Sequence, residues 1–216
     1  AAALARLAVA RQTTLANVVL AVFDLVLFQL TRQEDLCVGV SVANRGHPDL
    51  ERLIGFFVNL LPVRVRLNSA MEFDDLLREV SLAAAEAFEH QEYPFDLLVQ
   101  KLNPARAGNR QPLVNVVYAF QNFSDVHLSV GAAAGGSPAD AASAAELVPA
   151  GPFEHDFKTS KFDLTLFVFA DAGRLLLTLE YDTGLFRADT IRRYLGLLRR
   201  FAGQVALSAP AAPPSA

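Results

Sequence analysis

The chain has 216 residues, of which 52% are hydrophobic, and its formal net charge is −4 at pH 7. This length and composition predict a folded globular protein with a sizeable core. The acidic balance gives no electrostatic basis for binding nucleic acid or an anionic membrane, so we expect neither as a partner.

Three local features bound the class of protein further. The single cysteine, Cys37, can form neither an internal disulfide nor a multi-thiolate metal site, and its apolar neighbours indicate a buried structural side chain. The longest apolar run, 15–30, is interrupted by polar residues and is shorter than the roughly 20 residues that a bilayer span needs, so we expect a buried helix. The chain starts with alanine and its only methionine is Met71, so we expect a piece of a longer protein.

The first elements in chain order are a helical region and a strand. Residues 1–30 read as helical, with Thr13 and Thr14 available as caps for a helix that is apolar nearly all round. Such a helix should be covered on all sides. A polar turn then leads into 36–42, where apolar residues on both faces predict a central strand.

The stretch 54–64 combines a glycine, an apolar run, the amide Asn59 and the guanidinium of Arg64. Burying either polar group without a partner costs on the order of several kcal/mol, so each must be hydrogen-bonded, exposed or placed for a purpose. Its last residues run into 63–67, where apolar residues alternate with arginine and predict a strand with one solvent-facing side.

Helix signals dominate the next segment. Ser69 and Glu72 have the spacing of a capping box, which predicts a helix starting at Ser69. Pro94 disfavours helical geometry before it yet fits the first turn of a short helix over 95–102. The apolar face predicted for the first of these helices consists of Phe73, Leu76, Leu77, Val80, Ala84, Ala87 and Phe88.

The second half of the chain reads as strands and one helix. Residues 113–120 favour a strand, whereas 131–150 are rich in alanine, glycine, serine and proline and predict a mobile surface loop or disorder. The patterns 161–169 and 174–181 predict an antiparallel hairpin with Gly173 in its loop.

Apolar residues from Ile191 to Val205 recur at helical spacing and predict a final amphipathic helix, after which 208–216 look like an Ala/Pro-rich linker. We therefore place the domain at 1–207. Helices and strands mixed in this order predict an α/β fold, with a mixed β-sheet flanked by helices.

Catalytic signatures are largely missing from the sequence. None of the four histidines (His47, His90, His127 and His155) has another histidine or a cysteine at metal-ligand spacing, so no metal site is predicted. The nucleophile elbow, the zinc-protease motif and the phosphate-binding glycine loop are also absent. We interpret His90 as a helix C-cap and His47 as a turn residue.

Arginines also gather on or near the final helix, where a solvated face and a site for an acidic partner are both open interpretations. They are Arg187, Arg192, Arg193, Arg199 and Arg200.

Three stretches in fixed order resemble motifs of the condensation domains of nonribosomal peptide synthetases, which belong to the chloramphenicol-acetyltransferase-like superfamily. Residues 54–64 resemble the family's Ile-Gly-x-Phe-Val-Asn motif with its trailing arginine, and 90–96 resemble its His-Gln-Asp-Tyr-Pro-Phe-Glu motif. Residues 106–113 are similar to its arginine-to-Asn-Pro-Leu motif, with Gln111 where asparagine is usual. Supporting matches are 38–45, 161–164 and 180–186.

The resemblance covers only the second half of such a domain, because the family's His-His-x-x-x-Asp-Gly motif is absent from the sequence. It implies a C-terminal, chloramphenicol-acetyltransferase-like lobe that forms one wall of a tunnel. There a carrier-bound acceptor amine would attack a carrier-bound donor acyl thioester to form an amide. None of these residues is assigned to catalysis, and we expect the chain alone to be inactive.

By the same resemblance, Ser41, Phe57 and Asn59 are the expected substrate-tunnel residues, although a purely structural role for Asn59 is equally open. The other motif residues are expected to brace the lobe or to shape its corners. These are Arg45, Gly55, Arg64, His90, Tyr93, Pro94 and Phe95.

The resemblance also implies partners. No cofactor is expected to bind directly, since the substrates arrive on the phosphopantetheine of peptidyl carrier proteins. The N-terminal lobe of the same domain and a neighbouring adenylation domain are the other expected partners, in a cytoplasmic synthetase of secondary metabolism such as antibiotic biosynthesis. Two alternatives remain: a non-catalytic docking lobe for carrier proteins, and a relative that catalyses epimerisation, ester formation or acyl transfer.

Overall fold

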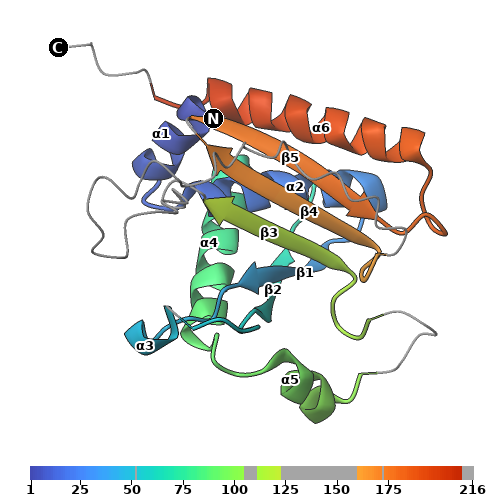
Figure 1. Cartoon of the computed structure of the whole chain (residues 1–216). Helices are drawn as coiled ribbons and strands as arrows, with labels where there is room; N and C mark the ends of the chain where they lie inside the picture. Colours follow the sequence, from blue (N-terminus) through green and yellow to red (C-terminus); the bar gives the residue numbers. More distant parts are fainter. Residues whose placement is uncertain (52, 105–110, 123–159, 172, 211–216) are drawn as a thin grey trace, which may run out of the picture.

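A computed structural model describes the chain except residues 52, 105–110, 123–159, 172 and 211–216 (Figure 1). The described elements are, in chain order, α1 (Ala2–Ala10), α2 (Leu15–Thr31), β1 (Asp35–Val42), α3 (Pro48–Glu51), β2 (Asn59–Arg66), α4 (Phe73–Glu89), α5 (Phe95–Leu102), β3 (Val116–Asn122), β4 (Leu164–Asp171), β5 (Arg174–Tyr181) and α6 (Ala188–Leu207).

The strands form one five-stranded sheet in the order β2-β1-β3-β4-β5. β1 pairs antiparallel with β2 and parallel with β3, β3 pairs parallel with β4, and β4 and β5 form the antiparallel hairpin. This arrangement confirms the predicted mixed sheet, the interior position of β1 and the hairpin at the end of the sheet.

The core lies on one side of this sheet, where α2, α4 and α6 pack (Figure 1). The strand registers bring Val38, Tyr118 and Leu166 onto that face, and all three are almost completely buried. Burying an apolar side chain of this size stabilises the fold by roughly 1.5–3 kcal/mol. The helices therefore cover one face of the sheet and leave the other to shorter segments.

The N-terminal helical region consists of two helices, α1 and α2. The break lies at Gln12, which has a positive φ of 51°, and Thr13 N–H donates to Ala8 O at 2.9 Å. Thr14 then caps α2, because its hydroxyl accepts from Asn17 N at 3.1 Å. α2 packs against neighbours around most of its circumference, so the predicted cap and buried helix are both confirmed.

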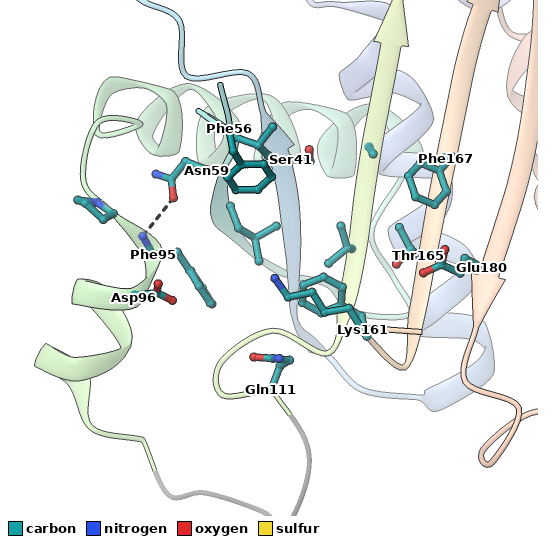
Figure 2. Close-up of a pocket in the computed structure, with 16 residues that line it drawn as sticks. Ser41, Phe56, Asn59, Phe95, Asp96, Gln111, Lys161, Thr165, Phe167 and Glu180 are labelled. Atoms are coloured by element: carbon teal, nitrogen blue, oxygen red, sulfur yellow. Dashed lines mark hydrogen bonds between the residues drawn. The ribbon is translucent and has the colours of Figure 1, made fainter. Parts of the chain in front are cut away.

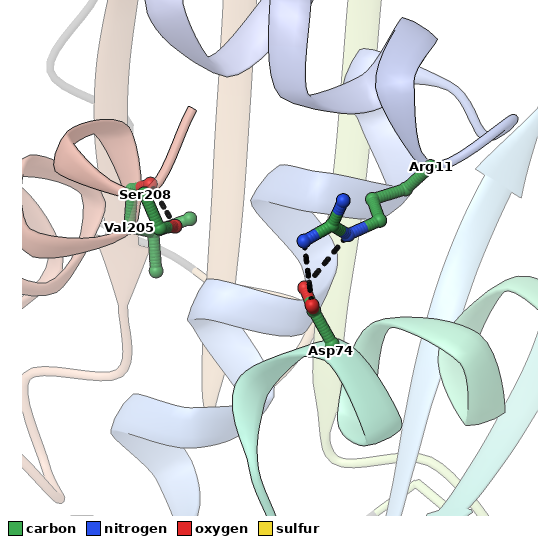
Figure 3. Close-up of polar contacts among 4 residues, drawn as sticks. All are labelled: Arg11, Asp74, Val205 and Ser208. Carbon is green, nitrogen blue, oxygen red and sulfur yellow. Dashed lines mark hydrogen bonds and ion pairs between the residues drawn. The ribbon is translucent and has the colours of Figure 1, made fainter. Parts of the chain in front are cut away.

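Polar contacts stabilise the ends of α1, α4 and α6. Arg11, which follows α1, donates from Nε and Nη2 to the two carboxylate oxygens of Asp74 in the first turn of α4, at 3.0 and 2.6 Å (Figure 3). After α6, Ser208 Oγ donates to Val205 O at 2.7 Å. Arg6 Nε donates to Pro210 O at 3.1 Å, so the chain still contacts the domain at Pro210.

The start of α4 differs from the prediction. The helix begins at Phe73 with Glu72 as its N-cap residue, and no side chain caps it, so the predicted Ser69 capping box is wrong. Asn68 explains the difference, because its side chain accepts from Ala70 N and its carbonyl accepts from Met71 N, which forms a turn where the helix was expected. Of the predicted apolar face, Leu76, Leu77, Val80 and Ala84 are buried, but Phe88 is exposed.

Strand boundaries also differ from the predictions. β2 starts at Asn59, four residues earlier than predicted, and its exposed Arg64 and Arg66 confirm the solvent-facing side. β3 starts at Val116 because Leu113 has a positive φ of 65°, which does not fit a strand. The short helix α5 and the final helix α6 are confirmed. The predicted mobile loop at 131–150 lies outside the described residues, as do His127 and His155.

Candidate functional site

A cavity of about 440 Å³ lies on the sheet face opposite the helices. Its floor consists of side chains that the registers place next to one another across three strands: Val117 of β3, Thr165 of β4 and Glu180 of β5. Ala119 and Phe167 form the next row of the floor. A cavity of this volume suits a small molecule or an extended segment of a molecule.

Segments far apart in the sequence form the walls of this pocket (Figure 2). Phe56 and Val58 come from the segment before β2, and Ser41 comes from β1. Phe95 and Asp96 stand at the start of α5 on the side opposite Glu180. The resulting pocket is mainly apolar, with several polar groups among its lining residues.

Asn59 connects β2 to the corner before α5. Its side chain is only 9% exposed, and its Nδ2 donates to Gln91 O at 2.8 Å and to Tyr93 O at 2.9 Å. Its Oδ1 accepts from Phe95 N at 3.1 Å. Both amide hydrogens therefore bind backbone, although the residue also lines the pocket. These bonds explain why an amide stands in an apolar stretch; contact with substrate stays a prediction.

Arg45 organises the segment between β1 and β2. Its guanidinium donates to Leu50 O, to Leu53 O at 2.9 Å and to Gly55 O at 3.2 Å. It also lies 4.4 Å from the centre of the Phe57 ring, a cation–π distance. Phe57 is thus held against Arg45, and its neighbours Phe56 and Val58 are the residues that line the pocket.

Arg64 lies away from the pocket, on the solvent-facing side of β2. Its Nε and Nη2 donate to the two carboxylate oxygens of Asp35 at 2.7 and 2.6 Å, which links β2 to β1. This hydrogen-bonded guanidinium holds the pKa of Asp35 below its ordinary value. The pair is solvent-exposed, so it aligns two strands rather than adding much stability.

Residues 90–95 form a tight corner beside the pocket. His90 follows α4 as its C-cap residue, and its carbonyl accepts from Tyr93 N at 3.0 Å. Pro94 precedes α5, and its carbonyl accepts from Leu98 N at 3.1 Å. Because Pro94 and Phe95 line the pocket, the corner that Asn59 holds is also part of the pocket wall.

Sequence reasoning gave no role to the residues at the far side of the pocket. Thr165 is only 3% exposed, and its Oγ1 has no hydrogen-bond partner among the described residues. Glu180 is half-buried, and its carboxylate lies 3.4 Å from Ser160 Oγ. Alternation along the strands places Thr165 and Phe167 on one face of β4, but only the strand order brings them into the pocket.

Asp24 and Tyr118 are ionisable groups buried in the core, whereas Cys37 of β1 is only partly buried. Asp24 of α2 is 1% exposed, and burial raises the pKa of its carboxyl to about 8. Burial also raises the pKa of the Cys37 thiol to about 11. Tyr118 donates its hydroxyl proton to Ala16 O at 2.8 Å, and burial raises its pKa well above the ordinary value. None of the three lines the pocket.

The described residues show neither a metal-ligand cluster nor a single membrane-spanning helix. Nowhere in this part of the chain do three or more His, Cys, Asp or Glu side chains gather as metal ligands would. No single helix there has the length and apolarity to cross a membrane; α1 and α2 meet that test only together, as a pair bent by 102°.

Comparisons with known proteins agree on one family. The family model for the condensation domain matches residues 1–214. Gramicidin S synthase 2 of Brevibacillus brevis is 37% identical over 184 residues, which cover 85% of this chain and 4% of that protein. Tyrocidine synthase 3 of Brevibacillus parabrevis is 34% identical over 181 residues, which cover 84% of this chain and 3% of that protein.

The solved condensation domain of the monacolin K polyketide synthase MokA shares the fold, with a TM-score of 0.76 at 18% identity. The alignment covers 96% of this chain and 44% of that one, so the chain spans less than half of that structure and a small fraction of its curated relatives. The five-stranded mixed sheet with its helices is therefore a lobe of the chloramphenicol-acetyltransferase-like fold. The chain belongs to the condensation-domain family.

Proposed function

We propose that this chain is the C-terminal lobe of a condensation domain and forms one wall of the tunnel in which an amide bond is made. The observation that carries the proposal is the pocket on the sheet face opposite α2, α4 and α6. Two motif segments, 54–60 and 93–96, form its walls, and the hairpin β4–β5 contributes to its floor. Three sequence regions with family motifs thus meet around one cavity.

The proposed reaction is attack of an acceptor amine on a donor acyl thioester. The described residues supply walls, a few polar groups and a rigid corner, which suit binding and orientation of two reacting groups. The group that would take a proton from the amine is expected in the His-His-x-x-x-Asp-Gly motif, which this sequence lacks. The upstream lobe is therefore a required partner in this proposal.

The remaining partners follow from the reaction. Both substrates would arrive on the phosphopantetheine arms of peptidyl carrier proteins, so we propose carrier proteins and an adjacent adenylation domain as neighbours in a cytoplasmic synthetase. We also propose that the lobe occupies 1–207 and that 208–216 lead to the next domain.

The decisive experiment joins this chain to its own upstream half and supplies donor and acceptor groups loaded on carrier proteins. Mass spectrometry of the carrier-bound products should find the amide-linked product with the joined protein. The product should disappear when the histidines of the upstream motif are replaced by alanine. Full activity of the 216-residue chain alone would contradict the requirement for a second lobe.

The same assay separates the rival functions. A stereochemically inverted substrate without a new bond would identify an epimerisation domain, and an ester product would identify an ester-forming relative. Carrier-protein binding without any product from the joined protein would identify a non-catalytic docking lobe. Each of these outcomes would overturn the amide-forming proposal.

A further inference from the structure

Three side chains meet at one end of the pocket floor: Thr165, Phe167 and Glu180. Thr165 of β4 is directly paired with Glu180 of β5, so their Cβ atoms are about 4.5–5.5 Å apart, as in any antiparallel pair. Phe167 follows two residues after Thr165 and therefore lies on the same face of β4. A hydroxyl, an aromatic ring and a carboxylate thus border one small volume (Figure 2).

The Thr165 hydroxyl is the first sign that this volume receives a ligand. It is almost fully buried, lines the pocket, and has no partner among the described residues. Buried hydroxyls in native structures are nearly always hydrogen-bonded, and a threonine hydroxyl can accept as well as donate. A bound molecule with a hydrogen-bond donor would supply the missing partner.

Glu180 contributes charge to the same place. Within the described part of the chain, no cation lies within ion-pair distance of its carboxylate, which has only the long 3.4 Å contact from Ser160 Oγ. Ser160 Oγ already donates its only proton to Phe162 O at 2.6 Å, so that proton is not free for a good hydrogen bond to Glu180. Lys161 lines the pocket too, but its side chain extends away from Glu180 (Figure 2). A half-buried carboxylate is therefore left facing the cavity.

We propose that Glu180, Thr165 and Phe167 form a subsite for a primary ammonium group of the substrate. The carboxylate would accept a charge-assisted hydrogen bond, the hydroxyl would accept a second one, and the ring face of Phe167 would attract the cation. The proposal rests on the proposed function, since an aminoacyl group delivered into the tunnel is what brings the amine. That amine can be the α-amine or one on the side chain.

The test measures binding of stable pantetheine amides to the protein that carries both lobes. Titration calorimetry would compare four probes, which separate the two sources of the amine: glycyl, N-acetylglycyl, Nα-acetyl-lysyl and Nα,Nε-diacetyl-lysyl pantetheine amide. At least one free-amine probe should bind about tenfold or more tightly than its acetylated counterpart, because a charged hydrogen bond is lost on acetylation. The probe that shows this preference identifies the amine's position.

Substitutions locate the preference in this subsite. Glu180→Gln should reduce it to less than about threefold, and Thr165→Val should weaken it while Thr165→Ser retains it. The matched control is Glu79→Gln, an exposed glutamate on α4, which should leave the preference unchanged. Thermal unfolding of every variant, in the same protein, shows that the fold survives.

Two results would overturn the subsite: equal binding of free-amine and acetylated probes, or an unchanged preference in Glu180→Gln. If the joined protein still makes the amide-linked product in that case, only the subsite proposal fails. A preference that depends on Glu180, in a protein that forms no product, would instead contradict the proposed function and leave the subsite supported.

Discussion

At the scale of single residues, the polar side chains Asn59 and Arg45 form hydrogen bonds with the backbone. Asn59 and Arg45 both donate to main-chain carbonyls, and their partners belong to the segments that form the pocket wall. A polar side chain that fixes a loop in this way determines where the loop's apolar neighbours point. Asn59 and Arg45 therefore position the wall whose surface Phe56 and Val58 provide.

Replacing Asn59 tests this role. Asn59→Leu removes the partners of Gln91 O, Tyr93 O and Phe95 N together, so the free energy of unfolding should fall by about 2–4 kcal/mol. Urea unfolding would measure it. Gln91→Ala is the control, since it alters the same corner without removing these bonds, and it should stay within about 0.5 kcal/mol of the wild type. A loss below about 1 kcal/mol in Asn59→Leu would contradict a bracing role.

The raised pKa of Asp24 predicts that the free energy of unfolding depends on pH. Burial raises its pKa to about 8 in the folded protein, so between its ordinary pKa near 4 and pH 8 the folded state holds a proton that the unfolded state has lost. Stability from this group is therefore greatest at low pH and falls as the pH rises through this window. Asp24→Asn should gain stability relative to the wild type between about pH 5 and pH 8, by up to about 1.4 kcal/mol per pH unit.

Chemical unfolding at several pH values would check this difference. Among the described residues, Tyr118 and Cys37 interact electrostatically with Asp24, and their raised pKa values keep both neutral in the same window. Glu86→Gln, at an exposed position on α4, is the control and should follow the wild type. Parallel stability curves for Asp24→Asn and the wild type would show that the carboxyl titrates normally.

At the scale of elements, local sequence patterns correctly predicted the helices and strands that depend mainly on local sequence. The buried helix α2, the amphipathic stripe of α4 and the β4–β5 hairpin follow from periodicity and caps within one segment. The start of α4 was predicted wrongly because two turn-forming signals compete there, and the Asn68 turn outweighs the Ser69 capping box. Such competition depends on how the turn packs, which the spacing of residues does not reveal.

The site was less predictable than the elements. Thr165 and Glu180 read only as strand residues, and they become a pair because β4 and β5 share a register. They meet the wall from 54–60 only because β1 and β3 lie between β2 and β4. The family resemblance drew attention to Asn59 and Phe57, whereas the residues that face the cavity include their neighbours Phe56 and Val58.

Gly39 shows how closely the elements approach on the pocket side of the sheet. A Cβ atom there would lie 2.6 Å from Val114 Cγ1 and 2.9 Å from Leu60 Cδ1. Gly39→Ala should therefore lower the free energy of unfolding by about 1–3 kcal/mol, through overpacking. Because the closest contact is with Val114, adding Val114→Ala should recover part of the loss caused by Gly39→Ala, as a double-mutant cycle would show.

Gly203 provides the comparison for this experiment. It lies in α6, and a Cβ atom added there would have no neighbour within 4 Å, so Gly203→Ala should stabilise the protein by about 0.5–1 kcal/mol. The two glycine-to-alanine changes should thus change the free energy of unfolding in opposite directions. Equal effects at the two positions, or no coupling between Gly39 and Val114, would contradict close packing as the cause.

At the scale of the whole molecule, exposed apolar side chains lie in or next to the two segments that form the walls of the pocket. Ile54 is fully exposed, Phe56 is 87% exposed, and Val58 and Leu97 are about half exposed. Exposed apolar groups gathered in this way mark interaction sites. The chain spans 44% of the MokA condensation domain, so a second lobe of comparable size is available to cover this surface in the proposed domain.

The upstream lobe, expressed as a separate chain, should therefore bind this one through Phe56 and Ile54. Phe56→Ser and Ile54→Ser should each weaken the association by about tenfold, the effect of losing one apolar anchor of an interface. Calorimetry of the two separate lobes would measure the dissociation constant. Leu207, at the end of α6, is also 87% exposed, so Leu207→Ser matches the loss of apolar surface elsewhere and should leave the affinity unchanged. If all three variants bind equally well, the two lobes meet on another face, and these exposed apolar side chains would have to be assigned to a different partner.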